Sequence, residues 1–201
     1  MKDCLQMSNK KIGAVILGAG LSVRMEQPKL LLSWAGKTVI EQIVEVLQQA
    51  DVNPVLIVAG RWWKEILALV ENRSVRVVFH PHYAETQMMQ TILLGLDALE
   101  QDVDAAMIVL GDQPQVKLEV VSGLVNAYQS GNGELIVPSY HMRRGHPWLM
   151  GRELWQDFRK METSREFLKQ FEKKIHYLEV ETDSILQDLD TPEDYQRYRP
   201  D

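Results

Sequence analysis

The sequence predicts an α/β fold in which a mostly parallel sheet is covered by helices on both faces. Apolar runs of strand length, such as residues 12–17, show no polar alternation, which indicates strands buried on both faces. Segments with helical spacing of apolar residues separate these runs, so strand and helix alternate up to residue 138. This alternation is typical of parallel sheets with crossover helices. The length of 201 residues suits one domain.

The alternating part contains five expected strands and four expected helices. The strands are expected at residues 12–17, 54–60, 75–79, 105–110 and 134–138. The helices are expected at residues 38–50, 64–72, 86–100 and 118–131, the last closed by Gly131 because glycine is common just past a helix end.

The alternation changes after residue 138. Residues 139–150 predict an extended segment with a turn near Arg144 and Gly145, and helical segments follow at 151–160 and 164–174, with Thr163 or Ser164 as N-cap. A late strand at 175–180 precedes a turn and short helix over 188–198, capped by Thr191 with Pro192 at its first position. We therefore expect a flexible segment over 1–10 and one domain over 11–201, with a C-terminal hairpin excursion.

Composition narrows the partners and the compartment. The net charge of −6 disfavours nucleic acid as a partner, because nucleic-acid binders usually present a basic face. Cys4 is the one cysteine, so no internal disulfide forms. The first residues lack a signal-peptide core, and no apolar run reaches the ~18 residues of a membrane span. We expect a cytoplasmic protein that contacts no membrane.

Glycines and cations gather at the end of the first expected strand. Gly18-Ala19-Gly20 is followed by Arg24 and Lys29, in the position where open α/β sheets bind ligands. Glycine lets backbone N–H groups approach an anion closely, so we expect a phosphate group as the ligand of this loop. The spacing fits neither the dinucleotide-binding loop nor the P-loop. The alternative is an ordinary strand–helix turn with solvated cations.

Four separated motifs carry a resemblance to a known family. The stretch LGAGLSVRMEQPKLLL resembles the opening signature of MobA-like nucleotidyltransferases, and within them the molybdenum cofactor cytidylyltransferase branch. Similar family motifs follow in order as LGDQPQV (110–116), RRGHPWLM (143–150) and DLDTPEDY (188–195). The resemblance implies a single-domain Rossmann-like nucleotidyltransferase fold.

The resemblance also implies a reaction. A nucleotidyl group, CMP from CTP, is transferred to a phosphomonoester acceptor such as molybdopterin, with Mg²⁺ or Mn²⁺ as cofactor and pyrophosphate as product. A client molybdoenzyme would be a further partner. The alternatives are a guanylyltransferase that uses GTP, a sugar- or polyol-phosphate nucleotidyltransferase, and a non-catalytic nucleotide- or cofactor-binding module.

The family's motifs assign roles to residues of this chain. The resemblance makes Arg24 and Lys29 the catalytic cations, and assigns nucleotide binding to Leu17, Gly18, Ala19, Gly20, Ser22 and Thr91. Ala19 favours CTP, because the guanylyl branch tends to carry glycine there. Thr91 has the alternative of an ordinary buried helix residue.

Metal and acceptor binding are assigned to later motifs. Asp112 and Asp190 are the implied metal ligands, with Asp188 as the competitor for the second role, and both have the alternative of capping turns. Mg²⁺ prefers one or two carboxylates together with phosphate oxygens and waters. Arg144, Gly145 and His146 are the implied acceptor-binding residues, and the alternative is a solvated hairpin tip.

Overall fold

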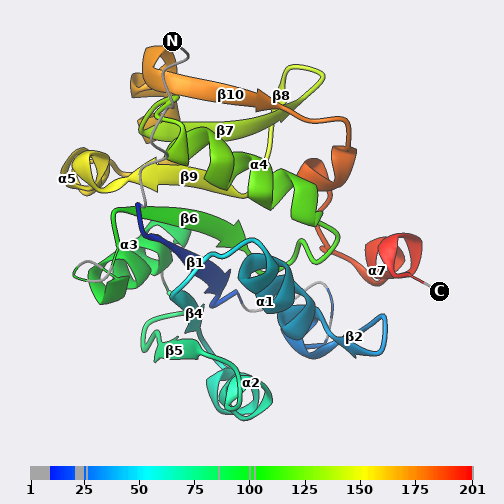
Figure 1. Ribbon diagram of the computed structural model, residues 1–201. Coiled ribbons are helices and arrows are strands. Elements are labelled where there is room, and N and C mark those ends of the chain that lie inside the picture. Colours follow the sequence, from blue (N-terminus) through cyan, green and yellow to red (C-terminus); the bar gives the residue numbers. More distant parts are fainter. Residues whose placement is uncertain are drawn as a thin grey trace.

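The computed structural model describes residues 10–20, 25, 27–85, 87–99, 101 and 103–200. Its centre is one eight-stranded mixed sheet with the order β10-β7-β9-β6-β1-β4-β5, and β8 pairs with β7 (Figure 1). The strands are β1 Ile12–Gly18, β4 Val55–Ala59, β5 Val75–Phe79, β6 Ala105–Leu110, β7 Leu135–Tyr140, β8 Arg143–Arg144, β9 Trp148–Gly151 and β10 Ile175–Glu179. A separate hairpin joins β2 (Ser33–Trp34) to β3 (Lys37–Thr38).

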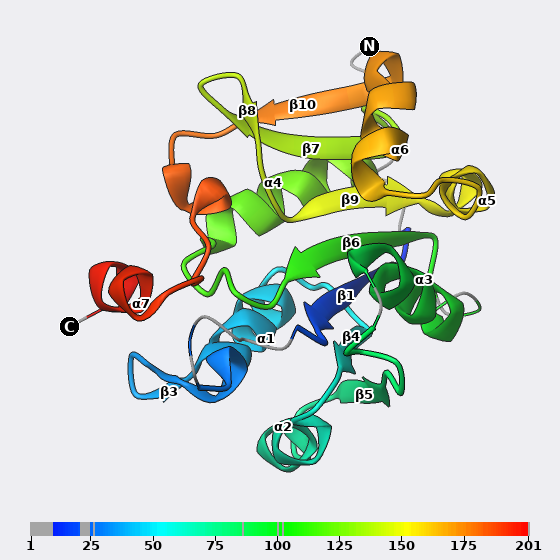
Figure 2. The same ribbon diagram turned by 180° about the vertical axis from the view of Figure 1, so that it is seen from behind.

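Helices cover both faces of the sheet, as expected. One face carries α1 (Val39–Gln49), α2 (Trp63–Val70) and α4 (Leu118–Gln129), and the other carries α3 (Met88–Leu99), α5 (Trp155–Phe158) and α6 (Ser164–Gln170) (Figures 1 and 2). The 3₁₀ turns are η2 Lys29–Leu31, η3 Arg152–Leu154, η4 Glu172–Lys174 and η5 Asp183–Leu186, and α7 (Pro192–Tyr198) ends the described chain. No helix in the described part of the chain is long and apolar enough to cross a bilayer.

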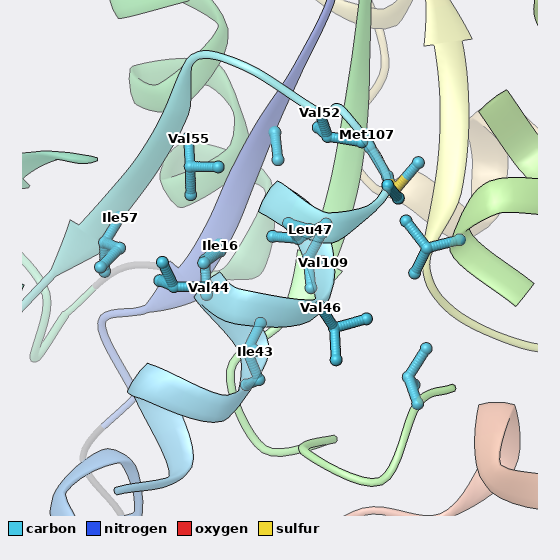
Figure 3. Packing of buried hydrophobic residues seen from close by; sticks show 14 of the residues in the cluster. Ile16, Ile43, Val44, Val46, Leu47, Val52, Val55, Ile57, Met107 and Val109 are labelled. Carbon is cyan, nitrogen blue, oxygen red and sulfur yellow. The ribbon is translucent and has the colours of Figure 1, made fainter. Parts of the chain in front are cut away.

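The core is two apolar layers separated by the sheet. On β1, Ile16 belongs to the layer under α1 and Val15 to the layer under α3, and both side chains are fully buried. In the first layer, Ile43 and Leu47 of α1 pack near Val109 of β6 (Figure 3). This burial on both faces explains why the central strands read as continuous apolar runs.

The expected N-caps of α6 and α7 are present, and α1 has a further one. Thr38 caps α1 in a capping box with Glu41, and Thr191 caps α7 in the same way with Pro192 at its first turn. The Thr163 hydroxyl accepts from the backbone N–H of Glu166 at 3.1 Å, which decides between the two expected caps of α6.

The segment after β7 differs from the expected one. The tight turn lies at His141 and Met142, where φ is +47° and +63°, and it closes the β7–β8 hairpin. The turn expected near Arg144 and Gly145 is wrong, because Gly145 serves close packing instead: a Cβ there would lie 2.4 Å from the carbonyl oxygen of Ile185. The chain continues into β9, which runs antiparallel between β6 and β7.

Candidate active site

Three side chains from distant parts of the sequence meet at the carboxyl ends of the parallel strands. Lys29 Nζ lies 2.8 Å from Asp190 Oδ1 and 3.4 Å from Asp112 Oδ2. Lys29 begins η2, Asp112 follows β6, and Asp190 immediately precedes the N-cap of α7. The structure thus places together one expected catalytic cation and both expected metal-binding carboxylates.

Two glycines allow the lysine to reach this position. A Cβ on Gly18 would lie 2.8 Å from Leu30 Cδ1, and a Cβ on Gly111 would lie 2.7 Å from the Leu17 carbonyl oxygen and 2.9 Å from Leu30 Cδ2. Leu30 follows Lys29 and is buried. Glycine at both strand ends therefore lets η2 seat against β1 and β6, which brings Lys29 beside Asp112.

Asp190 is held by what we call the C-terminal strap, residues 183–191. The backbone N–H of Leu189 donates to the Asp112 carbonyl at 2.9 Å, and the Leu189 side chain is fully buried. Beyond the strap, Tyr195 donates its hydroxyl to the Ser33 carbonyl at 2.6 Å and packs against Trp34. These anchors fix the strap across the edge of the sheet on which Asp112 lies.

Carboxylates outnumber the described cation in this cluster. Burial raises the pKa of Asp112 above its ordinary value, the Lys29 ammonium opposes that rise, and the negative charges of Asp188 and Asp190 add to it. The Lys29 side chain is only 12% exposed. Asp188 itself accepts a hydrogen bond from Gln113 Nε2 at 2.8 Å, so Asp190 is the strap carboxylate that contacts the lysine.

The donor set fits a hard divalent cation carried with a phosphate ligand. Asp112 and Asp190 direct carboxylate oxygens to one point, where the single Lys29 ammonium contacts both. No group of three or more His, Cys, Asp or Glu side chains in the described ranges could hold a metal ion alone. Magnesium commonly takes one or two carboxylates and completes its shell with phosphates and waters, so these residues fit it as part of a metal–nucleotide complex.

The glycine loop borders this cluster. Leu17 and Gly18 end β1, and Ala19 is 6% exposed. Gly20 is exposed, and a Cβ added to it would meet no atom of the described residues within 4 Å. The predicted Arg24 and Ser22 lie outside the described residues.

Thr91 lies in the first turn of α3 and is 7% exposed. One turn later, Gly95 packs directly on Val15 of β1. Thr91 thus lies on the buried side of the helix near the sheet, and its role in nucleotide binding stays a prediction.

The expected acceptor-binding residues lie in a different environment from the Lys29 cluster. Arg144 Nη2 donates to Glu172 Oε1 at 2.6 Å and its guanidinium lies over the Tyr177 ring, so the side chain faces β10. The backbone N–H of His146 donates to the Ile185 carbonyl at 3.1 Å. Burial lowers the pKa of His146 to about 4, so its imidazole is neutral at neutral pH.

Two glutamines of the LGDQPQV motif, which the sequence did not predict as site residues, contact the strap. Gln113 and Gln115 donate from their side-chain amides to the strap, Gln113 to Asp188 and Gln115 to the Gln187 carbonyl. The sequence feature that could have indicated them is the pair of polar residues two positions apart that follows Asp112. The structure shows that this loop is largely buried.

The comparison with protein families decides the assignment that the fold and site suggest. The model of the MobA-like NTP transferase domain matches residues 14–176, which is most of the chain. The chain belongs to this family. Its membership confirms the resemblance read from the four motifs, and the MobA-like domain is a nucleotidyltransferase domain.

Individual relatives of this MobA-like protein are distant. The molybdenum cofactor cytidylyltransferase of Escherichia coli (strain K12) is 23% identical over 92% of the chain and 93% of its own length. The nicotine blue oxidoreductase of Paenarthrobacter nicotinovorans is 27% identical over 94% and 95%.

Solved structures confirm the expected nucleotidyltransferase fold. Rv0371c from Mycobacterium tuberculosis H37Rv superposes with a TM-score of 0.79 at 24% identity, over 95% of this chain and 98% of that one. Its complex with manganese gives a TM-score of 0.75 at 22% identity, over 93% and 97%.

Proposed function

We propose that this MobA-like protein transfers CMP from CTP to the phosphomonoester of a molybdopterin acceptor, with Mg²⁺ as cofactor and pyrophosphate as product. The observation that carries the proposal is the meeting of Lys29 with Asp112 and Asp190, at 3.4 and 2.8 Å, at the carboxyl edge of the sheet. The name of the Escherichia coli relative supports the choice of CTP and acceptor.

The chemistry asks the protein for positioning and charge. An acceptor phosphate oxygen, already anionic near neutral pH, attacks the α-phosphorus in line, so no general base is required. The buried Lys29 ammonium is suited to offset the negative charge that develops on departing pyrophosphate. Backbone N–H groups along Gly18 to Gly20 would hold the triphosphate, and the strap carries its carboxylate to the same place.

Asp112 and Asp190 are the residues that would hold the metal. When bound, a divalent metal would supply positive charge that offsets the negative charge of the phosphate oxygens. The manganese complex of Rv0371c supports a divalent cation on this fold. Gly145 and His146 would contact the acceptor, and Arg144 would do so from its pair with Glu172.

The deciding experiment incubates the protein with each nucleoside triphosphate, Mg²⁺ and molybdopterin, and follows both pyrophosphate and the dinucleotide product. We expect product with CTP and none after EDTA. A parallel incubation with nicotine blue and NAD(P)H is included because a relative that matches 94% of the chain is named an oxidoreductase. Reduction of the dye without nucleotidyl transfer would overturn the proposal.

Ala19→Gly tests nucleotide selectivity. We propose that the Ala19 methyl narrows the space beside the end of β1, where a purine is bulkier than a pyrimidine. One methyl group discriminates by about 1–3 kcal/mol at most, and Ala19 is nearly buried, so we expect the lower end, a roughly tenfold relaxation toward GTP.

The measurement is kcat/KM for CTP and GTP with one acceptor, in the parent protein and in Ala19→Gly. Equal use of GTP by the parent would defeat the cytidylyl assignment and leave the nucleotidyltransferase assignment standing. An unchanged CTP/GTP ratio in the variant would remove Ala19 from base selection.

A further inference from the structure

The buried side-chain amide of Gln113 forms hydrogen bonds to the C-terminal strap at two places. The residue follows Asp112 directly, and its side chain is among the few buried polar groups, at 4% exposed. Its Nε2 donates to Asp188 Oδ1 at 2.8 Å and, over a longer distance of 3.5 Å, to the Ile185 carbonyl. One side chain thus bridges the loop that carries one site carboxylate and the strap that carries the other.

The amide is held there in spite of an unfavourable feature. Gln113 Oε1 is buried and has no hydrogen-bond partner among the described residues. Burying an acceptor without a donor costs free energy, whereas an apolar side chain of similar length would leave no such atom. Packing alone therefore favours leucine or methionine at this position. Glutamine differs from these two residues in its amide N–H donor, which contacts the strap.

The two groups that Gln113 contacts, Asp188 and the Ile185 carbonyl, each lie next to a part of the site. Ile185, whose carbonyl Gln113 approaches, also accepts from the backbone N–H of His146 at 3.1 Å. Asp188 lies two residues before Asp190, whose carboxylate contacts Lys29. Gln113 is therefore placed between the predicted acceptor-binding segment and the Lys29 cluster, and contacts the strap that joins them.

We propose that Gln113 is a positioning residue, which fixes the strap so that Asp190 and Asp112 address the same metal–triphosphate complex. The inference rests on the proposed function, since it assigns the two carboxylates to one metal ion. Gln113 does not touch substrate in this role. It acts through Asp188 and the strap backbone, and its loss would let Asp190 shift relative to Asp112.

The test is Gln113→Leu, which keeps the side-chain volume nearly constant. The change removes both the Nε2 donor and the buried Oε1 that lacks a partner among the described residues. We expect a melting temperature that is unchanged or higher, together with a loss of roughly 10- to 100-fold in kcat, the scale set by small displacements of reacting groups. The KM for CTP should change little. The Mn²⁺ concentration for half-maximal activity should rise at least fivefold, in keeping with a displaced ligand.

Gln115→Leu is the matched control. Gln115 lies on the same loop, also contacts the strap, and also has a buried Oε1 without a partner in the described part of the chain, but its contact is to the Gln187 carbonyl rather than to Asp188. We expect less than a threefold change in kcat and in Mn²⁺ dependence. Equal losses in the two variants would assign the effect to general attachment of the strap and overturn the specific role of Gln113.

A binding measurement separates this inference from the proposed function. Electron paramagnetic resonance of Mn²⁺ with a non-hydrolysable CTP analogue reports metal binding without turnover, in the parent, Gln113→Leu, Asp188→Ala and the double variant. We expect weaker Mn²⁺ binding in each, and little further weakening in the double variant, because both single changes break the 2.8 Å bond between Gln113 and Asp188, and the remaining contact to the Ile185 carbonyl is the longer one, at 3.5 Å.

Asp190→Asn completes the set. If Asp190→Asn leaves Mn²⁺ binding and activity intact, the proposed metal role of that carboxylate fails. If Asp190→Asn abolishes both while Gln113→Leu matches the parent, the proposed function stands and the positioning role of Gln113 is overturned. Additive losses in the double variant would also overturn it.

Discussion

Two lysine–carboxylate clusters lie at opposite ends of the same sheet. At the amino end, Lys10 Nζ pairs with Glu134 Oε1 at 3.2 Å and lies over the Tyr128 ring, 4.3 Å from its centroid. At the carboxyl end, Lys29 contacts Asp112 and Asp190. The Lys10 side chain is 31% exposed and the Lys29 side chain 12%.

The difference between the clusters lies in how the charges balance. Among the described residues, Lys10 has one carboxylate partner and lies over one aromatic ring. The Gln129 side chain also bonds to the backbone N–H and carbonyl of Lys10. At Lys29, two carboxylates contact one described cation, and burial raises the pKa of Asp112. In the first arrangement one described ammonium faces one carboxylate, so the two charges balance. In the Lys29 cluster, a further cation would balance the excess negative charge. This excess distinguishes a binding site from a structural ion pair.

The largest expected effect comes from removing each lysine in turn. Lys29→Ala should lower kcat by roughly 10²- to 10³-fold, because it removes a preorganised cation from the site of developing charge. Lys10→Ala should leave kcat within about twofold, since a partly exposed pair contributes little. Steady-state kinetics on both variants, with circular dichroism to confirm folding, makes the comparison. A folded Lys29→Ala protein with parental turnover would remove the distinction between the two ends.

Asp112→Asn should separate activity from stability. We expect activity to fall by about 100-fold and its dependence on metal to be lost. We also expect a higher melting temperature at pH 7 in the absence of metal. The pKa of Asp112 is raised in the folded protein, so the fold favours its protonated form and loses stability as the pH rises through the interval between the unfolded and the folded pKa. The neutral asparagine avoids this loss.

The matched control is Asp104→Asn at the amino end. Asp104 Oδ2 accepts from the backbone N–H of Lys11 at 2.7 Å, so weakening this acceptor should lower the melting temperature slightly and leave activity unchanged. If Asp112→Asn destabilises the protein as much as Asp104→Asn does, its carboxylate is a structural group like the control.

The smallest effect concerns acid stability at the predicted acceptor segment. The folded pKa of His146 is about 4, below its ordinary value, because burial disfavours the imidazolium. The unfolded chain therefore takes up the proton first, and stability falls as the pH drops from about 6.5 toward 4. Urea unfolding at about pH 7 and pH 5 should show a smaller pH difference in His146→Gln than in the parent. An equal difference in both would show that His146 is already solvated.

Much of the fold follows from local sequence rules. Fully buried strands such as β4 can be predicted from unbroken apolar runs, and caps such as Thr38 and Thr191 bond to residues three positions along the chain. The His141–Met142 turn could not be predicted in this way, because two successive residues with positive φ are not expected without glycine. Pairing of β7 with β8 imposes it.

The site was predictable only as separate pieces. Motif resemblance pointed to Lys29, Asp112 and Asp190, but nothing local shows that residues 161 positions apart touch. The pairing of Arg144 with Glu172 and the grip of Gln113 on Asp188 likewise depend on tertiary contacts. A residue's type suggests its chemistry, and its partners decide whether that chemistry is available.

The place of Asp190 on the strap has a consequence for biosynthesis. The ribosome makes the whole sheet before the strap. A nascent chain that has released residues up to β10 can therefore bury the layer under α3, while it still lacks Ile185 and Leu189 of the layer under α1 and one of the two carboxylates beside Lys29. Docking of Leu189 and Tyr195 then delivers the missing group. Completion of the layer under α1 and completion of the site would therefore coincide, and a chain shortened before the strap would lack both.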